Sequence, residues 1–273
     1  MSNRALAPVD TSTGEIITDG SAYIRHRSQD VGYGYAIEKE RYIYSTTDVH
    51  WVASYHDPIE RISRELTLTQ TGAIIKLLPY MRFKADGKLV KDGNPLNRAD
   101  IQRIFKRGKT ATGEIMTALE GAKVIHKRKE GRANVYYMSD EFHEKGNVKD
   151  GVSFTKLYQV RSREITDELN LHEAGVLYKV IPYFHYELFY LCANPNEKDF
   201  DKLRFINRQE LSDIIGLNVD DITRLVRKLK RLKALMSTES GVTVRYLIHP
   251  DLMYRMARET EWARSVRRMF DTH

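Results

Sequence analysis

Apolar residues in the last third of the chain recur with a helical period. They occupy the i, i+3, i+4 and i+7 positions of one helix face: Ile222, Leu225, Val226 and Leu229. This spacing predicts a helix over residues 218–232, with Asn218 or Asp220 as its N-cap. A shorter apolar pattern predicts a helix over Arg208–Ile215, capped by Asn207. Only a short turn that contains a glycine separates the two helices, which indicates a helix-turn-helix.

The residues that follow change from a helical to a strand pattern. Ala234–Met236 predicts a strand, Ser237–Gly241 a turn, and Val242–Ile248 a second strand that stops before Pro250. An apolar helical run over Glu173–Tyr183 precedes the helix-turn-helix. A helix-turn-helix followed by a β-hairpin is the arrangement of a winged helix.

The chain contains an internal duplication. A shift of 103 residues aligns Ile62–Phe83 with Ile165–Tyr186 without a gap, and eight of the 22 pairs are identical. After a slip of seven residues, a shift of 110 aligns Asn97 with Asn207 and continues to Tyr136 and Tyr246. Because the register recovers after one insertion, we interpret the chain as two copies of a unit of about 100 residues.

The first copy repeats the same order of elements. We expect a helix over Arg98–Phe105, a turn over Lys106–Lys109, a helix over Thr112–Ala122, and strands around Val124-Ile125 and over Ala133–Met138. The predicted fold class is mainly α with small β-hairpins (α+β), as two tandem winged helix-turn-helix domains. The expected divisions are a Tyr-rich arm (1–48), winged helix 1 (49–148), winged helix 2 (149–252) and a basic helix (253–273).

Composition and charge narrow the function classes. The 44 Lys and Arg exceed the 37 Asp and Glu by seven, and the pI is about 9.3, which permits attraction to phosphate. The single cysteine, Cys192, excludes a disulfide framework and a paired-cysteine metal site. No apolar run is long enough for a signal peptide or a membrane span, so we expect a cytoplasmic protein of a bacterial or phage-infected cell.

Several short motifs carry a family resemblance. They are Val9–Ile16, Tyr136–Phe142 followed by Lys145-Gly146, Phe154–Tyr158, Pro182-Tyr183 and Ile248–Pro250. With these motifs the chain resembles the winged-helix plasmid replication proteins of Firmicutes (RepL type) and their phage relatives. The usual form has one unit, whereas this chain has two, and Ser139 stands where proline is expected. The resemblance implies a role in replication.

The second copy offers the clearer candidate for DNA contact. In a helix-turn-helix, the second helix enters the major groove with its exposed face. We expect Arg224 and Arg227 to contact bases, because arginine can donate two parallel hydrogen bonds to guanine. The other expected DNA contacts of this copy, mainly to phosphates, are Thr223, Lys228, Lys230, Arg231 and, in the hairpin, Arg245.

In the first copy the aligned helix face is nearly uncharged. It consists of Gly113, Glu114, Thr117, Ala118 and Gly121. The basic residues lie in the turn and the hairpin instead, and the expected contacts are Lys106, Arg107, Lys109, Thr110, Thr112, Thr117, Lys127, Arg128, Lys129 and Arg132. We therefore predict a division of labour, in which the second copy recognises bases and the first binds mainly backbone. The alternative is that the first copy is a protein-interaction or dimerisation module.

The two ends of the chain are aromatic and basic. Tyrosines interleaved with basic residues over 21–48 could stack on unpaired bases, although a β-like flap that packs on the neighbouring domain is favoured. The segment Met253–Phe270 predicts a helix with an apolar stripe and five arginines. This helix is expected to support a homodimer, or to add phosphate contacts.

No motif indicates catalysis. Gly108-Lys109-Thr110 matches the end of a phosphate-binding P-loop, but Arg103 stands where the first glycine is required. The nine histidines form neither a His-x-His nor an HExxH pattern, His185 and His249 are expected at the surface or at strand ends, and Cys192 is expected to be unreactive. We predict a non-enzymatic protein without metal or cofactor. Its expected partners are double-stranded DNA and, as alternatives, the replication or transcription machinery; a protein-interaction scaffold remains the competing class.

Overall fold

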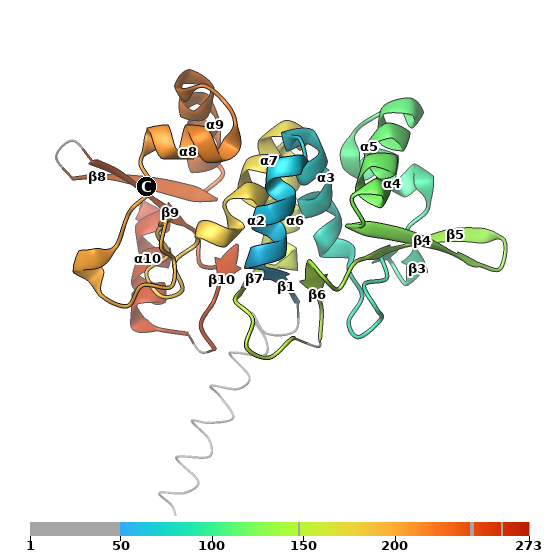
Figure 1. Ribbon diagram of the computed structural model, residues 1–273, viewed down its shortest axis with the longest axis horizontal. Coiled ribbons are helices and arrows are strands. Elements are labelled where there is room, and N and C mark those ends of the chain that lie inside the picture. Colours follow the sequence, from blue (N-terminus) through green and yellow to red (C-terminus); the bar gives the residue numbers. More distant parts are fainter. Residues whose placement is uncertain (1–49, 147, 241–242, 258, 273) are drawn as a thin grey trace, which may run out of the picture. The chain divides into compact units, whose positions relative to one another are not determined.

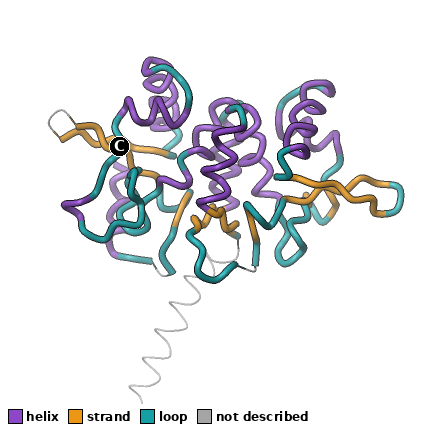
Figure 2. Tube along the Cα trace, viewed as in Figure 1, coloured by secondary structure: helices purple, strands orange, loops and turns teal. Residues whose placement is uncertain are grey.

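The computed structural model describes residues 50–146, 148–240, 243–257 and 259–272 (Figure 1). The Tyr-rich arm expected over residues 1–48 lies outside these described residues. Within them the chain is an α+β protein of nine α-helices and small antiparallel sheets, and Figure 2 shows helices and strands alternating through both copies.

The two copies contain α-helices and paired strands in the same order, but one connecting segment differs: the first copy has two short strands there and the second has a 3-10 turn. The first copy consists of β1 (Trp51–Tyr55), α2 (His56–Glu65), α3 (Leu68–Leu77), a 3-10 turn η1 (Leu78–Tyr80), β2 (Val90–Lys91), β3 (Asn94–Pro95), α4 (Arg98–Phe105), α5 (Lys109–Gly121), β4 (Ile125–Glu130), β5 (Ala133–Met138) and β6 (His143–Glu144). The second copy consists of β7 (Phe154–Tyr158), α6 (Gln159–Glu168), α7 (Leu171–Lys179), η2 (Ile181–Tyr183), η3 (Phe200–Lys202), α8 (Arg208–Ile215), α9 (Val219–Arg231), β8 (Leu235–Ser240), β9 (Thr243–Ile248) and β10 (Met253–Tyr254). Helix α10 (Glu261–Thr272) follows.

A central sheet joins the copies. Its strand order is β10-β7-β1-β6, and β1 runs antiparallel to β7. Trp51 lies opposite Tyr158, and Tyr55 lies opposite Phe154. The 103-residue shift converts Trp51 into Phe154 and Tyr55 into Tyr158, so it exchanges these two pairs. A local pseudo-two-fold axis therefore relates the copies at this sheet. The outer strands β6 and β10 extend the same symmetry.

Helices α3 and α7 form the second junction between the copies, and they approach each other at two glycines. A Cβ atom on Gly72 would lie 1.7 Å from the Leu171 carbonyl oxygen, and one on Gly175 would lie 2.1 Å from the Leu68 carbonyl oxygen. Only glycine permits this separation, because any side chain would overlap the neighbouring backbone. The buried apolar residues of both copies form one continuous core.

Each copy ends in a hairpin that is joined by a third extended segment. Strand β4 pairs with β5, and β8 pairs with β9. Lys88 forms an antiparallel bridge with Tyr137 in the first copy, and Tyr190 forms one with Leu247 in the second. In both copies, the segment between the 3-10 turn (η1 or η2) and the following helix (α4 or α8) therefore pairs with the second strand of the hairpin.

The predicted capping residues lie at the ends of α8 and α9. Asn207 accepts a hydrogen bond from the backbone of Glu210, and the Glu210 side chain accepts one from the backbone of Asn207, which confirms the predicted N-cap. Helix α8 ends at Gly216 with a φ of 80°. Of the two expected caps for α9, Asn218 is the one that accepts a hydrogen bond, from the backbone of Asp221.

Three sequence predictions were wrong at their boundaries. Helix α7 ends at Lys179 rather than Tyr183, because Pro182 lies in the 3-10 turn η2. Helix α5 begins at Lys109 rather than Thr112, with Gly108 as its N-cap. The first strand of each hairpin is longer than expected, since backbone pairing continues through polar residues that have no apolar alternation, whereas β5 has the predicted bounds.

The prediction of one helix over Met253–Phe270 was also wrong. Met253 and Tyr254 form β10, where they are buried at the edge of the central sheet, and α10 begins only at Glu261. The apolar residues of α10, among them Ala263, Val266 and Phe270, are buried within the chain. These residues therefore belong to the core of the chain, while Trp262 at the start of α10 is exposed.

Candidate nucleic-acid interface

Helix α9 separates an apolar face from a basic face. Ile222 and Leu229 are buried in the core, and Leu225 and Val226 pack against it. Asp220 lies in the first turn, and three basic residues lie in the last turn: Lys228, Lys230 and Arg231. Because acidic residues at the N-terminus and basic residues at the C-terminus complement the helix dipole, the sequence stabilises α9 while placing cations on its outer side.

The structure leaves most of the predicted residues of α9 available to a ligand. Arg224, Arg227, Lys230 and Arg231 are exposed, and 77% of the Arg224 side chain is accessible. Thr223 is half-buried and donates its hydroxyl to the Val219 carbonyl at 2.8 Å. These four cations therefore form a compact basic surface on one helix, which we call the α9 face.

Two of the predicted lysines contact helices near the centre of the molecule, α7 and α6. Lys228 forms an ion pair with Glu173 of α7, with 2.6 Å between Nζ and Oε2. Lys106 adopts a left-handed conformation at the end of α4 and donates Nζ to the Asp167 carbonyl at 2.6 Å. These interactions attach the α8–α9 pair to α7 and the α4–α5 pair to α6. The two lysines therefore help to position the helices proposed to bind DNA, as well as adding charge.

Helix α5 presents a contrasting surface in the first copy. Lys109, Thr110, Glu114 and Thr117 are exposed, and Arg107 is exposed in the preceding turn. Thr112 was an expected contact, but it is fully buried and donates its hydroxyl to the Arg107 carbonyl at 3.3 Å. Thr112 therefore stabilises the turn and is not accessible to a ligand.

A shallow cavity of about 670 Å³ lies over this outer side of α5. Gly113, Thr117 and Ala118 line it along the helix, and Arg98 and Lys127 line it from α4 and β4. The guanidinium of Arg98 extends over Gly113, where a Cβ atom would lie 2.5 Å from Nη2. The repeat alignment pairs Arg98 with Arg208, but our prediction from sequence did not include Arg98 among the candidate residues.

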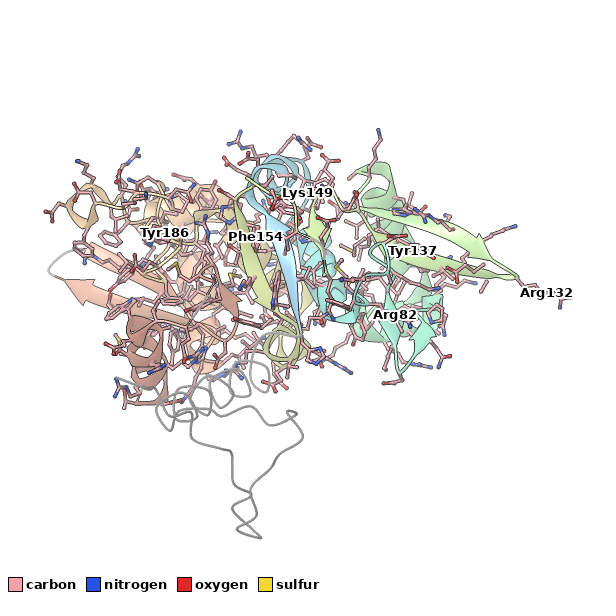
Figure 3. The ribbon with its side chains drawn as sticks, turned by 90° about the horizontal axis from the view of Figure 1, so that it is seen from below. Arg82, Arg132, Tyr137, Lys149, Phe154 and Tyr186 are labelled. Atoms are coloured by element: carbon pink, nitrogen blue, oxygen red, sulfur yellow. The ribbon has the colours of Figure 1, made fainter. Side chains whose placement is uncertain are left out.

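The β4–β5 hairpin carries the basic residues expected for a wing. Lys129 and Arg132 are exposed, and Figure 3 shows Arg132 at the tip of the hairpin, pointing away from the body of this copy. Lys127 forms an ion pair with Glu120 at 2.8 Å, and Arg128 lies 4.8 Å from the centroid of the Tyr137 ring. The freest cations of this hairpin are therefore at its end.

The second hairpin is supported on both sides. Its predicted contact, Arg245, is half-buried and lies 4.2 Å from the centroid of Phe205, a residue of the segment between η3 and α8. Behind the hairpin, His249 packs against Phe270 of α10 with ring centroids 4.6 Å apart. Arg245 is thus held against an aromatic ring rather than extended into solvent.

The buried histidines serve the packing of the central sheet. His143 contacts the Ser54 hydroxyl at 3.0 Å and the Tyr178 hydroxyl at 3.1 Å, and His56 contacts the Thr155 hydroxyl at 2.9 Å. Burial lowers the pKa of both imidazoles to about 3, so both are neutral at physiological pH.

His185 and His249 were expected at the surface or at strand ends; neither is at the surface, because both are buried, and His249 directly follows the end of β9. In each case Nδ1 accepts hydrogen bonds from backbone amides of the following turn: those of Glu187 and Leu188 for His185, and that of Asp251 for His249.

Cys192 was expected to be unreactive. Burial raises the pKa of its thiol to about 12, which disfavours the reactive thiolate.

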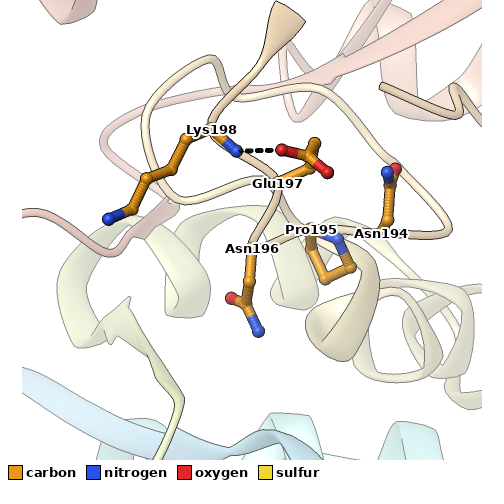
Figure 4. Close-up of a pocket in the computed structure, with 5 residues that line it drawn as sticks. All are labelled: Asn194, Pro195, Asn196, Glu197 and Lys198. Carbon is orange, nitrogen blue, oxygen red and sulfur yellow. Dashed lines mark hydrogen bonds between the residues drawn. The ribbon is translucent and has the colours of Figure 1, made fainter. Parts of the chain in front are cut away.

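A second cavity, of about 410 Å³, lies along the loop Asn194–Lys198 (Figure 4). The polar groups of this loop hold its own conformation. Glu197 accepts hydrogen bonds from the backbone amides of Lys198 and Asp199, and Asn194 accepts one from the amide of Arg204. These groups leave little free hydrogen-bonding capacity for a ligand, so the α9 face remains the best-defined candidate surface.

Across the described residues, no three His, Cys, Asp or Glu side chains lie close enough to hold a metal ion. None of the helices described is both long and apolar enough to cross a membrane. Comparisons with protein-family models, with curated proteins and with solved structures found no match.

Proposed function

We propose that this chain is a non-enzymatic, sequence-specific double-stranded DNA-binding protein, and that its two copies are tandem winged helices. The observation that carries the proposal is the α9 face. Four exposed cations lie on the second helix of a helix-turn-helix, where such proteins contact the major groove.

The order of elements supports the winged-helix interpretation. Each copy has a central helix, an extended segment bridged to the hairpin, two helices joined by a short turn, and the two hairpin strands. In the first copy the hairpin places Lys129 and Arg132 beyond the helices, which suits contact with phosphates beside the groove.

The pseudo-two-fold relation between the copies suggests how one chain would bind DNA. Helices α5 and α9 lie on opposite sides of the α3–α7 pair (Figure 1). Packed helices lie about 8–10 Å apart, so three such steps separate α5 from α9 by roughly 24–30 Å. Adjacent major grooves on one duplex face are about 34 Å apart. We therefore infer that α5 and α9 bind inverted half-sites that lie about one turn of the DNA helix apart.

A role in replication initiation at a plasmid or phage origin, or in its control, is the favoured setting. It rests on the resemblance of the motifs at Phe154–Tyr158 and Ile248–Pro250 to plasmid replication proteins. Transcriptional regulation is the second candidate, because the same surfaces would bind an operator. Mapping the binding site to an origin or to a promoter distinguishes these two roles.

The test is a titration of the full chain with random duplex and with duplex selected from a randomised pool, at two salt concentrations. We expect an enriched motif and an affinity that falls steeply with salt. Arg224→Ala and Arg227→Ala should each weaken the selected duplex by roughly 5- to 150-fold and leave random duplex nearly unchanged. Lys202→Ala is the control, since it removes one exposed cation from η3.

Absence of duplex binding at low salt would contradict the proposal and would favour a protein-interaction scaffold. An equal loss for all sequences in the two arginine variants would show that the α9 face binds backbone without recognising bases.

A further inference from the structure

The two candidate helices match in length and position and carry opposite charge at one site. Helices α5 and α9 each span 13 residues, and the 110-residue shift aligns their first and last residues. Glu114 therefore occupies the same place in α5 as Arg224 does in α9. Both side chains are exposed, and no described residue forms an ion pair with Glu114, whereas Arg224 lies 3.4 Å from Asp221.

The surroundings of Glu114 permit close approach by a large ligand. The cavity over α5 exists because Gly113 and Ala118 replace the larger Thr223 and Lys228 of α9. Thr117, one turn beyond Glu114, adds a hydroxyl and a methyl group to the same wall. Helix α5 thus offers one carboxylate within a small-residue surface, flanked by the cations Arg98 and Lys127.

The chemistry of base edges distinguishes the two side chains. Arginine donates to the two acceptors of guanine, O6 and N7. A carboxylate can only accept, and the cytosine N4 amino group is the donor that it meets in the major groove. A carboxylate also repels phosphates, so Glu114 is poorly suited to backbone binding and well suited to contact with a base.

We propose that Glu114 is a specificity-determining residue that selects cytosine in one half-site, at the position equivalent to the guanine selected by Arg224 in the other. The proposal rests on the proposed DNA-binding function. Because the copies are related by a pseudo-two-fold axis, the preferred duplex is an approximate inverted repeat, and this base pair is one position at which its symmetry is broken. Such a site fixes the direction in which a single chain binds.

The experiment is selection from a randomised duplex pool with the wild-type chain and with Glu114→Arg, which copies the residue of the second helix. Wild type should enrich guanine in one half-site and cytosine at the equivalent position of the other. Glu114→Arg should enrich guanine at both positions, which restores the symmetry of the site at this base pair. Exchange of the preferred base should change affinity by roughly 5- to 150-fold for each protein.

Glu114→Gln is the matched variant, because it keeps the size of the side chain and adds a donor. Since an amide pairs with the N6 and N7 atoms of adenine, this variant should replace the cytosine preference with adenine. Thermal unfolding of each variant should match the wild type, because Glu114 is exposed.

An unchanged motif in both variants overturns the proposal, including the case in which Glu114→Arg binds all duplexes more tightly. Failure of the underlying function gives a different result: the wild-type chain itself would then enrich no motif, and the role of Glu114 would fall with it.

Discussion

The two copies share a backbone plan but differ in the surfaces that they present. Helices α4 and α8 have the same length, and both begin with an asparagine capping box. On the outer side, Glu114 and Thr117 of α5 stand where Arg224 and Arg227 stand in α9. Buried positions are restricted by packing, whereas exposed positions are free to change, so duplication can yield one scaffold with two unlike surfaces.

The hairpins differ in support as well as in charge. Phe205 packs against Arg245 of the second hairpin and Phe270 of α10 packs against His249, the residue after β9, while the first hairpin extends its cations Lys129 and Arg132 beyond the helices. The first copy therefore places its free charge on a projecting hairpin, and the second places it on a helix.

The largest expected effect concerns the helix junction that the copies share. Gly72→Ala and Gly175→Ala should each destabilise the protein by about 3 kcal/mol or more, because the added Cβ would overlap a backbone carbonyl. The two variants should be similar, since the contacts are symmetric. Urea unfolding measures the loss.

Gly121→Ala is the control for this comparison. Nothing lies within 4 Å of a Cβ at Gly121, so alanine should leave stability unchanged or raise it by about 0.5–1 kcal/mol. Equal stability of all three variants would show that α3 and α7 are not in such close contact.

Acid stability should depend strongly on two buried histidines of the first copy, alongside His185 and His249 of the second, whose pKa values burial also lowers. His56 and His143 have pKa values of about 3 in the folded protein, against about 6.5 unfolded. The unfolded chain binds the extra protons between these values, so the stabilisation is present above pH 6.5 and is lost as the pH falls towards 3. Each histidine adds a slope of about 1.4 kcal/mol per pH unit.

The second copy supplies the matched substitutions for that test. Gln159 and Met253 occupy the equivalent positions, so His56→Gln and His143→Met should flatten the dependence of unfolding free energy on pH. A pH dependence that both variants leave intact would assign the acid sensitivity to other groups.

Exchange of surface residues tests the contrast between the helices. Thr117→Arg copies Arg227 into α5, and it should raise duplex affinity several-fold and steepen the salt dependence by about one unit. Arg227→Thr should weaken the selected duplex and leave random duplex nearly unchanged, since Arg227 is proposed to contact a base. If Thr117→Arg changes neither quantity, α5 does not face DNA, and a protein-interaction role for the first copy gains support.

The smallest effect is expected at the first hairpin. Lys129→Ala combined with Arg132→Ala should reduce the salt slope by about two units, uniformly across sequences, because both residues are proposed to contact phosphates. Lys198→Ala, on the loop before α8, is the control and should change nothing. A loss confined to one sequence would show instead that the hairpin recognises bases.

The eight identities of the aligned segments included the residues that join the copies. Gly72 and Gly175 allow the close approach of α3 and α7, and Lys76 donates to the Thr166 carbonyl in α6 of the other copy. The alignment detected these positions, but it gave no reason for them, because the reason is a contact between the copies.

The sequence by itself determined the duplication, the α8 boundaries and caps, the amphipathic character of α9 and the basic residues of its face. These features depend on short-range periodicity and on hydrogen bonds within a few residues, which the sequence carries directly. Only the tertiary structure decided that the copies share one sheet and one core, that Thr112 is buried, that Lys228 pairs with Glu173, and that Met253 lies in a strand. Each of these depends on residues distant in the chain, whose proximity no local pattern encodes.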